Sequence, residues 1–195
     1  MAKRQFLTLP LLILVSFLCA PSGGESAAPA ASFITNSCRA TTYPSVCVQS
    51  LSSYASTIQK SPKQLVITAL SVSVERAQST KSFVRKLTKF RGLKPREYAA
   101  IKDCYDQISD SVGRLSDSAR ELKTLGRAGK TDFLWHMSNM QTWVSAALTD
   151  DSTCMDGFSG RALDGRIKSS VRARLTSVAQ VTSNALALCN KFAGN

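Results

Sequence analysis

The stretch that decides the fold is residues 95–126, PREYAAIKDCYDQISDSVGRLSDSARELKTLG. Its apolar residues recur every three or four positions without a break, which is the spacing of one helical face. A proline near its start and a glycine at its end are typical of helix boundaries. Such unbroken spacing marks a narrow seam of the kind that packs in helix bundles. The seam consists of Tyr98, Ile101, Tyr105, Ile108, Val112, Leu115, Ala119 and Leu122.

One further helix is expected before this one and another after it. Before it, Ser61 and Pro62 supply a capping hydroxyl and a proline for the first turn, and Gly92 is expected to stop that helix. After it, Thr131 or Asp132 is expected to cap a third helix. No segment in this region shows the alternating pattern of a strand, so the sequence predicts an all-α domain.

The last part of the chain completes a bundle. Three glycines between Asp151 and Arg166 predict the longest loop there, and a fourth helix is expected from Ile167 to Cys189. Four helices joined mostly by short loops predict an up-down-up-down four-helix bundle over residues 61–193.

Residues 33–60 are expected to form a separate extension ahead of the bundle. Two cysteines, Cys38 and Cys47, stand close together there with a proline between them. This spacing predicts a bent, stapled segment of two short helices, which is a helical hairpin.

The chain opens with a pattern typical of secretory signal peptides. Lys3 and Arg4 precede an apolar run from Phe6 to Ala20. This run is shorter than the roughly 20 residues that a membrane-spanning helix needs. We therefore expect residues 1–24 to be a signal peptide, with cleavage somewhere between residues 20 and 30. The remaining chain, residues 33–193, is expected to be one secreted domain without a membrane anchor.

Secretion would place the cysteines in an oxidising compartment, where they pair. Of the six cysteines, Cys19 would leave with the signal peptide, so an odd number remains. Counting alone therefore predicts one free thiol and leaves the connectivity open. The sequence has no Cys-x-x-Cys pair, and His136 is its single histidine, so no metal site is expected.

Composition and motifs limit the function classes. Hydrophobic residues make up 44% of the chain and charged residues 19%, which excludes a disordered chain. The net charge of +12 falls to about +10 without the signal peptide. It predicts either weak adhesion to extracellular polyanions, rather than nucleic acid, or simply a solvated basic surface. No nucleophile elbow, phosphate-binding loop or catalytic triad pattern is present, so neither catalysis nor a cofactor is expected.

Two longer motifs resemble a known family. Residues 37–47, SCRATTYPSVC, place Tyr-Pro between two cysteines, and residues 143–158, WVSAALTDDSTCMDGF, lead into and past another. Together with Cys104 between them, these motifs resemble the plant invertase and pectin methylesterase inhibitor family. The resemblance covers nearly the whole mature chain.

The resemblance implies a structure, a location and a function. The family fold is a four-helix bundle with a helical hairpin extension, secreted to the plant cell wall in the apoplast, where it binds and blocks a carbohydrate-active enzyme. The segment 143–158 resembles the methylesterase branch, whose members cover the enzyme's pectin-binding cleft, one inhibitor to one enzyme. The invertase branch is the alternative, although its Pro-Lys-Phe tripeptide is absent. The implied disulfides are Cys38–Cys47 and Cys104–Cys154, with Cys189 free.

An acidic stripe marks the seam helix. Its members avoid the apolar face, and three of them repeat every seven residues, so they share one side of the helix. The methylesterase branch carries acids two and six positions after the cysteine equivalent to Cys104, which makes Asp106 and Asp110 the predicted partner contacts. Another acid usual in that stretch is Gly113 here. The alternative is a solvated face moderated by nearby arginines. The stripe is Asp103, Asp106, Asp110 and Asp117.

Overall fold

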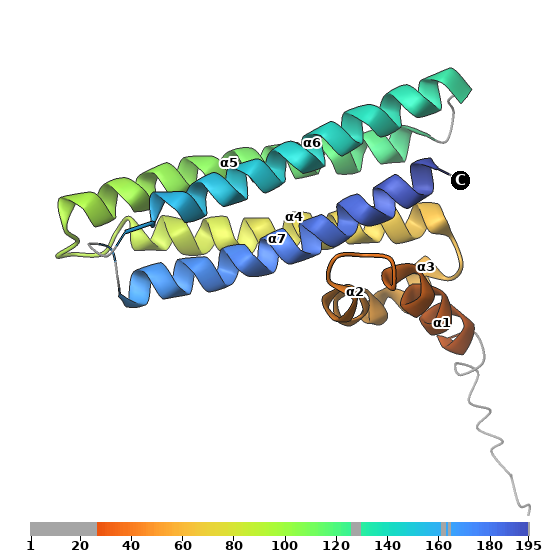
Figure 1. The fold of residues 1–195 in the computed structure, drawn as a ribbon, viewed down its shortest axis with the longest axis horizontal. Helices are drawn as coiled ribbons and strands as arrows, with labels where there is room; N and C mark the ends of the chain where they lie inside the picture. Colours follow the sequence, from red (N-terminus) through yellow and green to blue (C-terminus); the bar gives the residue numbers. More distant parts are fainter. Residues whose placement is uncertain (1–26, 126–129, 161–162, 164, 195) are drawn as a thin grey trace, which may run out of the picture.

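Four long helices lie side by side in the computed structural model, each antiparallel to the one before it (Figure 1). The structure describes residues 27–125, 130–160, 163 and 165–194, which contain helices and turns but no strand. The expected signal peptide, residues 1–24, lies outside this described part. The prediction of an all-α, up-down-up-down bundle with an N-terminal helical extension is confirmed. The elements are α1 Ala27–Cys38, α2 Pro44–Leu51, the 3₁₀ turn η1 Ser52–Tyr54, α3 Ala55–Ile58, α4 Pro62–Leu87, α5 Pro95–Thr124, α6 Lys130–Gly157 and α7 Arg166–Ala193.

The predicted start of the first long helix is correct. Ser61 caps α4, because its hydroxyl accepts a hydrogen bond of 3.2 Å from the backbone N–H of Gln64. The helix ends at Leu87, and Gly92 makes the following turn with a φ of +82°, a left-handed conformation that favours glycine. The next helix, α5, begins at the predicted proline, Pro95.

Two predicted boundaries of α6 are wrong. The helix begins at Lys130, so Thr131 and Asp132 lie in its first turn instead of capping it. The loop predicted from Asp151 onward is helical as far as Gly157. The side chain of Asp151 points into the core, and Cys154 is bonded to α5, so packing extends the helix through a region whose glycines suggested a loop.

The hairpin extension packs against one end of the bundle (Figure 1). It starts earlier than predicted, at Ala27 rather than residue 33, and contains η1 and the short α3 in addition to α1 and α2. A disulfide joins Cys38 to Cys47 across its turn. The side chain of Asn184 on α7 accepts from the N–H of Tyr43 at 2.8 Å and donates to its carbonyl at 2.9 Å. Both polar groups of a buried amide therefore hold the hairpin turn on the bundle.

Four of the eight predicted seam residues lie in the centre of the core, whereas Tyr98 is 48% exposed and the other three are partly buried. Ile101, Ile108, Leu115 and Leu122 of α5 are almost completely buried. The buried positions between those four are taken by Cys104, Ser111 and Ser118, which are too small or polar to mark an apolar stripe.

Cys189 on α7 is a buried free thiol whose sulfur lies 4.0 Å from that of Met140, and burial raises its pKa to about 12. The thiol therefore behaves as a small apolar side chain.

A second disulfide joins α5 to α6 inside the bundle. Cys104 and Cys154 are both buried, with their Cα atoms 4.3 Å apart. The bond spans 50 residues of sequence, so it removes many conformations from the unfolded chain.

Replacing both Cys104 and Cys154 with alanine is expected to destabilise the bundle by about 4 kcal/mol, because the loop-closure constraint on the unfolded chain is lost. For a chain of this size that corresponds to a melting temperature lower by roughly 8–16 °C, measured by circular dichroism. Cys189→Ala is the control, since it removes a buried sulfur but no cross-link. A double variant melting within about two degrees of the parent would contradict the prediction.

Candidate functional site

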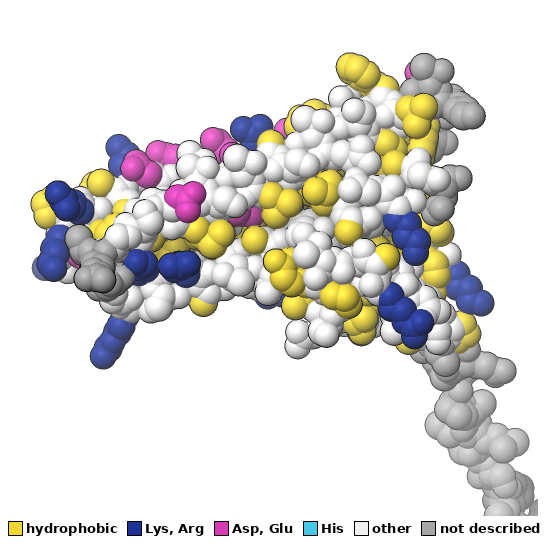
Figure 2. Space-filling view, in the orientation of Figure 1, with side chains coloured by type: hydrophobic (Ala, Val, Ile, Leu, Met, Phe, Trp, Pro, Cys, Tyr) yellow, Lys and Arg dark blue, Asp and Glu magenta, His cyan; other side chains and the backbone are white. Residues whose placement is uncertain are grey.

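The outer face of α5 presents the predicted acidic stripe to solvent. Asp103, Asp106 and Asp110 are exposed, and Asp106 and Asp110 lie one helical turn apart. Figure 2 shows acidic side chains gathered over the α5–α6 side of the molecule. The structure therefore places both predicted contact residues on an accessible helical face.

The negative charge of the stripe is partly neutralised toward the C-terminal end of α5. Asp117 forms an ion pair with Arg120 one turn along the same helix. The guanidinium Nε of Arg114 lies 2.8 Å from a carboxylate oxygen of Asp150 on α6. Asp103, Asp106 and Asp110 form no ion pair with any described residue, so the uncompensated negative charge lies on the part of α5 nearer its N-terminus.

The ion pair between α5 and α6 was not predicted from the sequence. Burial raises the pKa of Asp150, while the hydrogen bond and charge of Arg114 lower it and the charge of Asp110 raises it. Asp110 is therefore close enough to influence the Arg114–Asp150 pair. Only the positions of the two helices bring these residues together, because they are far apart in sequence.

Asp151 occupies a different environment from its sequence neighbour Asp150. Its side chain is completely buried, and neither carboxylate oxygen has a hydrogen-bond partner among the described residues. Burial, with a smaller contribution from the charge of Asp150, raises its pKa to about 7. The hydroxyl of Ser111 on α5 is near enough to lower the pKa in part, although it forms no well-oriented hydrogen bond with the carboxylate. Because Asp151 is inaccessible to solvent, the two adjacent carboxyl groups cannot act together on a bound substrate.

No group of side chains in the described part of the chain is arranged to hold a metal ion. His136 instead contacts Glu121 through its Nδ1 atom, 2.6 Å from a carboxylate oxygen. Among the described helices, none is long and apolar enough to cross a membrane.

Comparisons with known proteins identify the family. Residues 32–188 match the family described as Plant invertase/pectin methylesterase inhibitor. The chain belongs to this family. A protein of Daucus carota named 21 kDa protein is 58% identical over 168 residues, covering 86% of this chain and 87% of its own length. Pectinesterase inhibitor 11 of Arabidopsis thaliana is 54% identical over 199 residues, covering 99% and 98%.

The solved structures agree with this family's fold. The crystal structure of mutant form A of a pectin methylesterase inhibitor from Arabidopsis matches with a TM-score of 0.65 at 24% identity. The match covers 80% of this chain and 95% of the other. The family's helical bundle is thus shared, and the structure of this inhibitor-family chain contains the same two cysteine pairs that the resemblance implies.

Several exposed apolar side chains of this inhibitor-family chain were not singled out from the sequence. Leu134 and Trp135 are 55% and 67% exposed at the start of α6. Phe90 is also exposed, after the end of α4. For Leu134 and Trp135 the available signal was their position off the apolar stripe of the helix, since a large apolar residue outside that stripe faces solvent.

The buried Asp151 predicts how the stability of this inhibitor-family chain depends on pH. Its folded pKa of about 7 lies above the ordinary value of 3.8, so between these values the folded chain holds a proton that the unfolded chain releases. The free energy of unfolding is therefore expected to fall as pH rises through this window, by up to roughly 4 kcal/mol. Denaturant titrations at about pH 4.5 and about pH 7.5 cover most of this window and should differ by roughly 3 kcal/mol.

Asp151→Asn is expected to remove most of this pH dependence and to be the more stable protein at the higher pH. Asp156→Asn on the same helix is the control, because Asp156 is exposed. Equal slopes for the parent and the Asp151→Asn variant would show that this carboxyl group does not control the pH response.

Proposed function

We propose that this protein is a secreted inhibitor of pectin methylesterase that limits the removal of methyl esters from pectin in the plant cell wall. The observation that carries the proposal is the similarity to Pectinesterase inhibitor 11 along nearly the full length of both chains. Pectinesterase inhibitor 9 of the same plant is also 48% identical over 99% of this chain. These names favour a methylesterase target over an invertase. The protein acts by binding and not by catalysis.

The outer face of α5 is the proposed contact surface. A rigid helical face can cover a long polysaccharide-binding cleft and so exclude the substrate from it. Asp106 and Asp110 supply uncompensated negative charge on that face, which fits a cleft carrying positive or hydrogen-bonding groups. One bundle would cover one enzyme. The net positive charge additionally supports weak adhesion to polyanions.

Replacing Asp106 and Asp110 together with asparagine is expected to weaken binding to a purified pectin methylesterase by roughly 1–4 kcal/mol, because contacts to charged groups are lost. The dissociation constant is measured by calorimetry, and circular dichroism checks that the helices remain.

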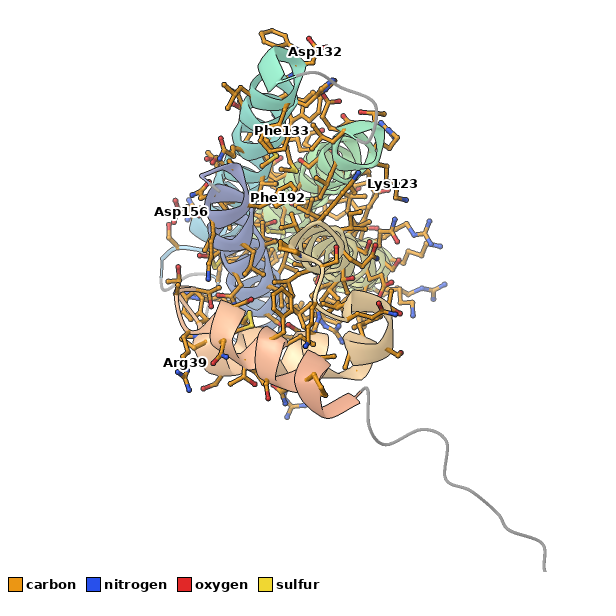
Figure 3. All side chains as sticks on the ribbon, turned by 90° about the vertical axis from the view of Figure 1, so that its right-hand side faces the viewer. Arg39, Lys123, Asp132, Phe133, Asp156 and Phe192 are labelled. Atoms are coloured by element: carbon orange, nitrogen blue, oxygen red, sulfur yellow. A yellow bond between two sulfur atoms is a disulfide. The ribbon has the colours of Figure 1, made fainter. Side chains whose placement is uncertain are left out.

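The matched control replaces Asp132 and Asp156, two exposed aspartates of α6 (Figure 3), with asparagine. It makes the same change in net charge away from the proposed surface. If both double variants bind as tightly as the parent, the α5 face is not the contact. A parent protein that inhibits a purified invertase but no methylesterase would refute the proposed function itself.

The N-terminal region is proposed to direct secretion and then to be removed. The helix α1 starts at Ala27 and already buries Ala30, so cleavage ahead of Ala27 keeps the hairpin extension whole. Sequencing the N-terminus of protein secreted by plant cells is expected to find a start between residues 20 and 30. Secreted protein that retains the apolar run would contradict the assignment of residues 1–24.

A further inference from the structure

A polar groove runs between α4 and α7, on the side of the bundle opposite the α5–α6 pair. It has a volume of about 410 Å³. Side chains from both helices line it, and they offer hydroxyl groups, two guanidinium groups and an aromatic ring. They include Arg76, Ser79, Phe83, Ser170, Arg174 and Ser177.

The two arginines are each held by the opposite helix. Arg76 of α4 donates a hydrogen bond of 2.8 Å to the hydroxyl of Ser177 on α7. Arg174 of α7 stacks over the ring of Phe83 on α4, 4.1 Å from the ring centroid. This crossed arrangement fixes both guanidinium groups at the groove before any ligand arrives, which lowers the ordering cost of binding.

No described carboxylate forms an ion pair with Arg76 or Arg174, although both are exposed. Glu75 is the one acid of α4, and α7 has none. Glu75 lines an adjoining groove toward the hairpin, and Arg76 and Arg174 line that groove as well. Both arginines therefore lie near one carboxylate at the hairpin end, but neither forms an ion pair with it, and the two positive charges outnumber that single acid.

The α4–α7 interface continues beyond the groove to an end of the bundle that carries further basic side chains. One or two turns beyond Phe83, α4 and its following turn present Lys86 and Phe90, and α7 begins with Arg166. Figure 2 shows Lys and Arg side chains gathered at this end. Arg166 lies at a helix N-terminus, where a positive charge opposes the helix dipole, so helix stability does not explain its presence there.

We propose that the α4–α7 groove binds an acidic polysaccharide, a polyuronate chain carrying free carboxylates. Guanidinium groups bind carboxylates through paired hydrogen bonds, hydroxyl groups match those of sugars, and an aromatic ring offers an apolar face to sugar C–H groups. The identity of the polymer rests on the proposed function, because hydrolysis of pectin methyl esters leaves a polyuronate. The groove lies away from the α5 face, so the polymer and the enzyme can be bound together.

The test measures binding of the full secreted chain to de-esterified polygalacturonate, highly methyl-esterified pectin and dextran sulfate in about 0.1 M salt without any enzyme. Replacing Arg76 and Arg174 together with glutamine is expected to weaken polygalacturonate binding about tenfold, because two ion pairs with carboxylates are lost. Phe83→Leu, which keeps an apolar side chain but removes the ring under Arg174, should weaken it several-fold. Esterified pectin should bind at least about tenfold more weakly than polygalacturonate.

The matched control replaces Arg39 and Lys123 with glutamine, which removes the same charge at the other end of the bundle (Figure 3). It should change binding less than about twofold. Three results would overturn the proposed groove site. They are equal losses of affinity in the two double variants, binding of dextran sulfate as tight as that of polygalacturonate, and no polygalacturonate binding at all. Inhibition of methylesterase is assayed separately. A parent that binds polygalacturonate but inhibits no methylesterase would refute the proposed function while leaving the groove as an acidic-polysaccharide site.

Discussion

The covalent bond between Cys104 and Cys154 fixes the register on which the rest of the bundle depends. It brings the backbones of α5 and α6 to within 4.3 Å between Cα atoms. Ser118 and Met140 lie equally far from the bond along the two antiparallel helices, and the Ser118 hydroxyl reaches the Met140 carbonyl at 3.4 Å. The same register sets Arg114 of α5 beside α6, where its ion pair forms. One bond near one end thus aligns polar contacts along the length of the pair.

The described core is unusual in containing polar side chains without hydrogen-bond partners. Ser111, Asp151 and Thr182 are fully buried, and their side-chain oxygens lack hydrogen-bond partners among the described residues. A buried ionised carboxylate without a partner is costly, so the neutral form of Asp151 is favoured at acidic pH. The fold is therefore expected to be more stable in mildly acidic solution than in neutral solution.

The sequence predicted features that depend on local spacing and missed those that depend on helix register. The cap at Ser61 and the apolar face of α5 follow from residues a few positions apart. The cap is correct, and four of the eight predicted seam residues are buried. The prediction missed Ser111 and Ser118, which are buried although their side chains are polar. The α6 boundary was wrong because glycine content outweighed the inward-facing Asp151 and Cys154, whose packing extends the helix.

The proposed binding residues also divide into those that local spacing predicts and those that depend on how the helices pack. Exposure of Asp106 and Asp110 followed from helical spacing, since both avoid the apolar stripe. The crossed contacts of Arg76 and Arg174 depend on how α4 lies against α7, which periodicity does not specify. The Asn184 contact with the hairpin turn is also between distant parts of the chain, so no local pattern could indicate it.

Charge on this protein is divided between two sides rather than spread evenly. The acids concentrate on α5 and α6, whereas α7 contains none and α4 contains only Glu75. Net charge alone would predict adhesion to any polyanion over the whole surface, but this division leaves an acidic side for a protein partner and a basic groove for an anionic polymer. If each side binds its proposed ligand, an inhibitor held on de-esterified pectin is concentrated where the enzyme has already acted. A modest affinity in the groove then raises the local concentration of inhibitor near the enzyme without any change in the enzyme contact.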